Sequence, residues 1–119
     1  MSTRCNIHFV EGDRREANIY RHCDGYPDGD SGVIADLQSF FTQVKKECEK
    51  DMYGCRFEDA SYLAAKFIVW QAGQNSAPGS LAFGSLGVMG RDAGDAEYIY
   101  TVNCDELDHN GFPTVTYTE

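Results

Sequence analysis

This sequence lacks long hydrophobic stretches. No apolar run approaches eighteen residues, and no basic segment followed by an apolar region stands near its first residue. The sequence therefore predicts neither a membrane span nor a secretion signal. We expect a cytoplasmic protein without a membrane partner.

Positive charge is also scarce. Ten lysines and arginines stand against nineteen aspartates and glutamates, a formal net charge of −9. The imbalance is greatest in residues 68–119, where seven acids face Arg91 as the one cation. Such a chain repels phosphates, so we expect no direct binding of nucleic acid. A charged partner, if there is one, should be basic.

Motifs that hold metals or perform catalysis are missing. The five cysteines form no C-x-x-C pair, and their odd number argues against a disulfide framework. G-x-S-x-G, G-x-x-x-x-G-K-[ST] and H-E-x-x-H are absent. A calcium loop read from Asp28 would place Gly32 at a ligand position. We therefore predict no metal, no cofactor and no enzymatic activity.

What the sequence does contain is clear periodicity. Alternating apolar residues predict strands over residues 5–10, 16–22, 86–89, 97–103 and 114–118. Apolar residues at helical spacing predict amphipathic helices over residues 33–49 and 60–71. Asp30 or Ser31 is a suitable N-cap for the first helix, and Glu58 or Asp59 for the second. Gly73, Asn75 and Pro78 predict the end of the second helix.

This order of elements indicates the fold class. Two strands are followed by two helices and then by three strands. Helices grouped between two sets of strands favour an α+β fold, with a largely antiparallel sheet and both helices packed on one face. Its 119 residues fit a single domain.

Reactive side chains are concentrated in residues 20–32, which we call the signature loop. It carries one arginine, one histidine, one cysteine and three aspartates. One interpretation is architectural: Arg21 pairs with Asp24 across the turn, Gly25 supplies a positive φ, and Asp30 caps the helix. The loop would then only fix how the strand pair meets the helix.

The other interpretation is a ligand site. The glycines before residue 33 leave a helix N-terminus that can attract an anion, and neighbouring cations can add hydrogen bonds. The candidate ligand-binding residues are Arg21, His22, Asp24 and Tyr26. Asp28 and Asp30 oppose an anion at the same point.

Several motifs carry a resemblance to a known group of proteins. The run Tyr20-Arg21-His22-x-Asp24-Gly25-Tyr26-Pro27 precedes an amphipathic helix, and Gly94-Asp95-x-Glu97-Tyr98-x-Tyr100 follows later. Together they resemble a family of small uncharacterised proteins from phages, prophages and bacterial genomes, with a Y-[RK]-H-x-D-G-Y-P signature and a later G-D-x-E-Y-x-Y strand. The resemblance implies a shared fold and a phage context, without a catalytic role. Here Cys23 stands where an aromatic or other residue is common in such proteins.

Two hypotheses of function follow. The first is a small acidic protein-binding module without enzymatic activity, such as a phage-encoded inhibitor of a host defence protein, acting in the host cytoplasm. Its partner would be a host protein with a basic surface. The predicted partner-binding residues are acids of the second half: Asp92, Asp95, Glu97, Asp105, Glu106 and Asp108. The alternative is a binder of a small anionic ligand or nucleotide, or an enzyme, centred on residues 20–27.

Overall fold

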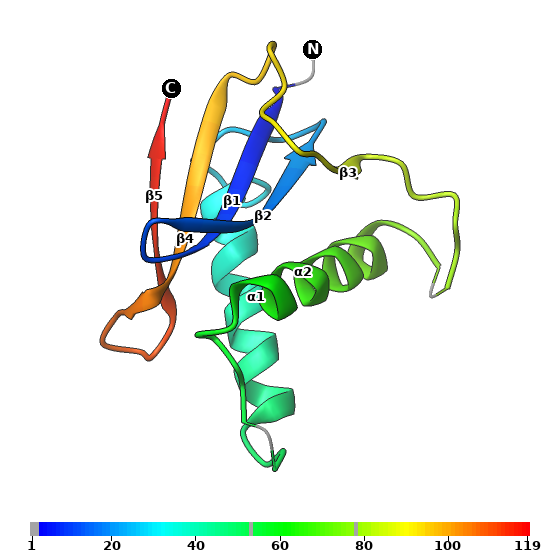
Figure 1. Cartoon of the computed structure of the whole chain (residues 1–119). Coiled ribbons are helices and arrows are strands. Elements are labelled where there is room, and N and C mark those ends of the chain that lie inside the picture. Colours follow the sequence, from blue (N-terminus) through cyan, green and yellow to red (C-terminus); the bar gives the residue numbers. More distant parts are fainter. Residues whose placement is uncertain (1–2, 53, 78) are drawn as a thin grey trace.

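The computed structural model describes residues 3–52, 54–77 and 79–119. Its elements follow the predicted order (Figure 1). They are β1 (Cys5–Glu11), β2 (Arg14–Arg21), α1 (Val33–Cys48), α2 (Ala60–Asn75), β3 (Leu86–Val88), β4 (Tyr98–Leu107) and β5 (Pro113–Thr118). The predicted α+β class is confirmed.

The strands form one five-stranded sheet in the order β3-β2-β1-β4-β5. Three of its four pairings are antiparallel, and β1 pairs with β4 in parallel. The sheet is thus mixed, although largely antiparallel as predicted. The parallel pair arises because both helices lie between the β1–β2 hairpin and β4, so the chain can return to the same end of the sheet before β4 begins.

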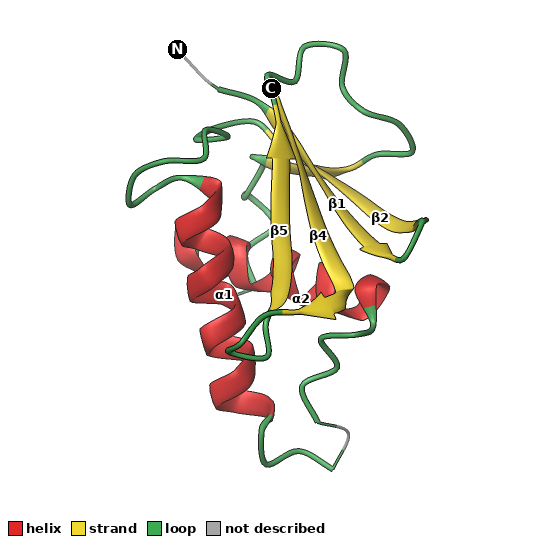
Figure 2. Ribbon diagram, turned by 90° about the vertical axis from the view of Figure 1, so that its left-hand side faces the viewer, coloured by secondary structure: helices red, strands yellow, loops and turns green. Residues whose placement is uncertain are grey.

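Both helices cover the same face of the sheet (Figure 2). The core consists of the sheet residues on that face and of the apolar stripes of the helices. Phe40 of α1 meets Phe67 of α2 edge-on, with ring centroids 5.3 Å apart. Phe67 in turn contacts Phe9 of β1 at 6.0 Å. Aromatic contacts therefore connect both helices to the central strand.

The ends of three elements differ from the prediction by two residues or more. Strand β2 begins at Arg14, because Gly12, with a φ of 65°, allows a turn of only two residues. Strand β4 continues past a register shift to Leu107, so part of the predicted polar loop is strand. Helix α2 runs through Gly73 to Asn75, and its C-cap residue Ser76 donates both its backbone N–H and its Oγ–H to Ala72 O. Pro78 lies outside the described residues.

The predicted N-caps were wrong in their chemistry. Gly32 occupies the N-cap position of α1 and makes no side-chain cap, so neither Asp30 nor Ser31 fills that role. Asp59 occupies the N-cap position of α2 but also makes no side-chain cap. Instead, Glu11 at the end of β1 accepts a hydrogen bond from the Ala60 backbone N–H at 3.0 Å. The sheet itself thus supplies an acceptor for the start of α2.

Candidate functional site

Arg21 is the centre of the signature loop, and it is buried. Its side chain is 6% exposed and forms an ion pair with Asp36 of α1, with Nη1 2.7 Å from Oδ2. It also donates to Gln71 Oε1 of α2 at 3.1 Å. The backbone oxygens of Cys23 and Ser31 accept two further hydrogen bonds, each at 2.9 Å. The expected Arg21–Asp24 pair is therefore wrong, and this guanidinium ties the loop, the sheet and both helices together.

Gly25 has a different role from the one predicted. Its φ is not positive, whereas that of Asp24 is 56°. Gly25 is needed because the backbone packs closely here: its N–H donates to Thr3 O at 2.9 Å, and an added Cβ would lie 2.8 Å from that same oxygen. The Gly25 carbonyl accepts a hydrogen bond at 2.7 Å from the buried hydroxyl of Tyr100. Burial raises the pKa of that hydroxyl.

Two of the four predicted ligand-binding residues, Arg21 and Asp24, line a common cavity, and the other two do not. His22 Nδ1 lies 2.8 Å from the Tyr20 hydroxyl, and Tyr26 donates to Asp24 Oδ1 at 3.1 Å. Arg21 and Asp24 line one cavity, whereas His22 and Tyr26 do not contribute to it. The structure thus does not gather the set into one site.

The cavity has a volume of about 190 Å³ and is rich in acceptors. It is lined by Arg21, Asp24, Asp30, Ser31, Asp36, Gln71, Gln74 and Asn75. Burial raises the pKa of Asp36, and the neighbouring Arg21 opposes that rise. Three carboxylates around one guanidinium leave an excess of negative charge. An anion would meet repulsion there, whereas an ammonium or guanidinium group would find acceptors.

Further carboxylates lie at the same end of the sheet as this cavity because of the sheet topology. The pairing registers place the beginnings of β1 and β4 at the same end of the sheet as the ends of β2 and β5. We call this the signature end. Its acids are Asp24, Asp28, Asp30, Asp36, Asp95, Glu97 and Glu119. The signature loop and part of the acidic second half therefore lie at the same end of the sheet.

Both arginines at the signature end already form ion pairs. Arg21 pairs with Asp36, and Arg4 pairs with Asp95 at 2.8 Å. Burial raises the pKa of Tyr98, the first residue of β4, and the charges of Glu119, Glu97 and Asp28 raise it further. Most of the negative charge at this end is thus unneutralised.

The six predicted partner-binding acids lie in three places. Asp95 and Glu97 belong to the signature end. Asp105, Glu106 and Asp108 lie at the opposite end of β4, roughly 30 Å away for a strand of this length. There, Asp108 Oδ1 accepts hydrogen bonds from the backbone N–H groups of Asn110 and Phe112. It therefore holds the turn between β4 and β5.

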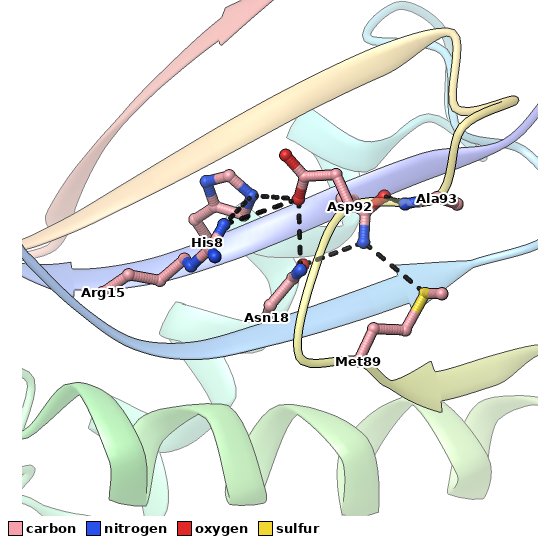
Figure 3. Close-up of polar contacts among 7 residues, drawn as sticks. His8, Arg15, Asn18, Met89, Asp92 and Ala93 are labelled. Atoms are coloured by element: carbon pink, nitrogen blue, oxygen red, sulfur yellow. Dashed lines mark hydrogen bonds and ion pairs between the residues drawn. The ribbon is translucent and has the colours of Figure 1, made fainter.

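Asp92 lies in the third place, on the sheet face opposite the helices (Figure 3). Its Oδ1 is 2.6 Å from His8 Nε2 and accepts a hydrogen bond from Asn18 Nδ2 at 3.1 Å. Arg15 Nη1 lies 3.2 Å from the same histidine nitrogen. These contacts fasten the segment before β4 to the outer face of β1 and β2.

Asn6 completes this cluster and is fully buried. Its amide nitrogen donates to Asn18 Oδ1 at 2.8 Å, and its oxygen accepts the Ala93 N–H at 2.9 Å. A buried asparagine with both ends used is typical of a structural clamp. Asn6 alternates with the core residues Cys5 and Ile7 along β1 and therefore lies on the outer face, but no local pattern in the sequence shows that a later segment covers this face.

An apolar groove between the two helices is the largest hollow that we describe. It has a volume of about 400 Å³ and is lined mainly by Phe40, Val44, Cys48, Val69 and Trp70. Trp70 packs against Phe40 with ring centroids 5.9 Å apart, so it belongs both to the core margin and to the groove. Val69 is 74% exposed at the rim.

Sequence reasoning missed several members of the cavity, above all Asp36 and Gln71. Both lie outside the signature loop, Asp36 in the first turn of α1 directly after it and Gln71 in α2, much later in the chain. The sequence held one signal for Asp36. Arg21 alternates with the apolar residues of its strand, and Asp36 is the acid in the first turn of the helix that follows. For Gln71, nothing in the local pattern indicates a contact with residue 21.

Comparison with known proteins adds no relative: no protein-family model, no curated protein and no solved structure matches this chain. In the described parts of the chain, no helix is both long and apolar enough to cross a membrane. Among the same residues, no three His, Cys, Asp or Glu side chains are grouped in a way that could hold a metal ion.

Proposed function

We propose that this chain is a non-enzymatic protein-binding module that engages a basic surface of another protein through the signature end. The observation that carries the proposal is the gathering of seven carboxylates at one end of the sheet around two arginines that are both already paired. A surface of this kind attracts a positively charged partner from a distance and orients it before contact.

The cavity at Arg21 gives this surface a point of contact. Asp24, Asp30 and the amides of Gln74 and Asn75 line it. A lysine or arginine side chain of the partner can enter there and be neutralised by the excess of carboxylates. The anionic-ligand alternative is less well supported, because the guanidinium of Arg21 already binds four oxygens.

The opposite end of the sheet carries a similar number of acids but uses several of them in the fold. Glu11 accepts the N–H at the start of α2, Asp59 pairs with Arg56 at 3.4 Å, and Asp108 holds a turn. The resemblance to phage and prophage proteins favours a host protein as the partner, with inhibition as the outcome of binding.

Two matched variants test this proposal in a pull-down from bacterial lysate at increasing salt. The first neutralises exposed acids of the signature end: Asp24→Asn, Asp28→Asn, Asp30→Asn and Glu97→Gln. The second neutralises exposed acids of the opposite end: Asp13→Asn, Glu58→Gln, Asp105→Asn and Glu106→Gln. Each changes the net charge by the same amount, so only the place of the charge differs.

We expect one partner to be retained by the wild-type chain and by the second variant, and to be lost by the first variant and at high salt. Equal loss in both variants would indicate attraction by net charge alone. Binding that is insensitive to salt would also contradict the proposal.

A further inference from the structure

Strand β5 is an open edge of the sheet. It pairs with β4 on one side, and no described strand pairs with its other side (Figure 1). Its sequence, PTVTYT, contains no charged residue. The opposite edge is different, because β3 is only three residues long and has glycine at its centre. Native proteins usually protect an edge strand by shortness, charged residues, proline or a bulge. Strand β5 has a proline at its first residue, but it carries no charge along its length.

We propose that two copies of this chain pair through β5 in an antiparallel manner, about a two-fold axis at Thr116. Residues that face each other across an antiparallel pair lie on the same face of the sheet. A two-fold axis at Thr116 therefore sets Thr116 against Thr116 of the second copy. In the same register, Val115 of each copy faces Tyr117 of the other copy, and Thr114 of each copy faces Thr118 of the other. Threonine pairs and aromatic pairs with β-branched residues are favourable cross-strand neighbours.

The exposure of Tyr117 supports this arrangement. Its ring packs against Tyr100 at 5.5 Å and Tyr98 at 6.2 Å on the inner side. The residue is nevertheless 46% exposed, because no strand lies beyond β5. In the proposed pair, Val115 of the second copy would cover this ring, and Tyr117 of the second copy would cover Val115.

Charge decides the direction of the pairing. Glu119 follows β5 at the signature end, beside Glu97 and Tyr98. A parallel pair would bring two such ends together, whereas an antiparallel pair separates them by the length of the strand. The neighbouring register, centred on Val115, would set Tyr117 against Pro113, which has no N–H to donate. An antiparallel pair centred on Thr116 keeps the two acidic ends apart and does not set Tyr117 against Pro113.

This inference does not depend on the proposed binding of a basic partner. The dimer would leave both signature ends open, at opposite ends of a continuous ten-stranded sheet. Since a six-residue edge buries little area, the pair should form at moderate to high micromolar concentration rather than at nanomolar concentration.

Sedimentation velocity over a concentration series tests the dimer. We expect the mass to rise from 13.3 kDa toward twice that value as concentration increases. Thr116→Lys and Thr116→Glu each place like charges across the axis, so each variant alone should stay monomeric. An equimolar mixture of the two should restore the dimer. Thr42→Lys changes an exposed threonine on α1 and should behave as the wild type.

A wild-type chain that stays monomeric at every concentration would overturn the proposal. A dimer that persists in both Thr116 variants, or that the mixture fails to restore, would also overturn it.

A crosslink gives a second readout that does not require charge in the strand. In a Cys23→Ser background, oxidised Thr116→Cys should form a covalent dimer while Thr42→Cys should not, because Cα atoms facing each other across an antiparallel pair are within disulfide range.

Discussion

Arg21 of β2 and Asp36 of α1 form an ion pair with both side chains largely buried: they are 6% and 20% exposed, and Nη1 lies 2.7 Å from Oδ2. The pair joins the end of a strand to the first turn of a helix. Because Arg21 also donates to Gln71 of α2, one guanidinium contacts both helices at the end of the sheet. Arg21 therefore has a structural role, and the acids around it determine the negative charge of the signature end.

Without the Arg21 side chain, the protein should unfold more easily. Arg21→Ala leaves the Asp36 carboxylate buried without its cation, so we expect the free energy of unfolding to fall by roughly 3–5 kcal/mol. Arg21→Lys should also be costly, because an ammonium cannot reproduce the forked geometry of four contacts. Urea unfolding measures both variants. Arg91→Ala, at an exposed position, is the control, and an equal small effect at the two arginines would contradict the assigned role.

Gly25 and Gly73 should respond in opposite directions to the same substitution. Gly25→Ala places a Cβ 2.8 Å from Thr3 O, so the loop must shift and the variant should be less stable than the wild type. Gly73 lies inside α2, and nothing is within 4 Å of the place of its missing Cβ. Gly73→Ala should therefore stabilise the chain by about 0.5–1 kcal/mol. Thermal unfolding of both variants checks the pair, and a Gly25→Ala variant as stable as the wild type would show that Gly25 is not specially constrained.

The fold was predictable because its elements have strong local patterns. Val33, Leu37, Phe40 and Val44 repeat at helical spacing and are all buried, and β1 alternates between core and outer face. The parallel pairing of β1 with β4 was not predictable in the same way. It depends on how the chain returns after two helices, and no local period encodes that path.

The candidate site was less predictable, because its contacts join distant segments. Asp24 is the acid nearest to Arg21 in sequence, yet the partner is Asp36, fifteen residues away. A clue existed: Arg21 alternates with Ala17 and Ile19, so it points toward the core, whereas Asp24 follows the strand. Likewise, the acceptor at the start of α2 is Glu11, which is 49 residues away in sequence. Local capping rules cannot find such a partner.

The outer-face clamp should control the segment that precedes β4. Asn6→Ala removes the acceptor of the Ala93 N–H and the donor to Asn18. Leaving buried polar groups unpaired costs about 1–3 kcal/mol, and the Ala93 amide should exchange its hydrogen faster. Hydrogen exchange measured by NMR tests this directly. Asn110→Ala, in the exposed turn after β4, is the control; unchanged exchange at Ala93 in the Asn6 variant would contradict the clamp.

Two buried thiols should make the chain sensitive to alkali. Burial raises the pKa of Cys5 and of Cys104 from 9.0 to about 12. A folded-state pKa above the unfolded one gives stability that is complete below the unfolded pKa and is lost as pH rises through the folded pKa. The free energy of unfolding should therefore decline between about pH 9 and pH 12, because the unfolded chain releases these protons first.

Replacing both thiols tests this cause. In the double variant Cys5→Ala and Cys104→Ala, the decline between pH 9 and pH 12 should be shallower than in the wild type, whatever the stability at neutral pH. Cys23→Ala removes an exposed thiol and should leave the slope unchanged. Burial also raises the pKa of Tyr100, so part of the decline should remain in the double variant. An identical slope in all three chains would mean that the buried thiols keep their ordinary pKa.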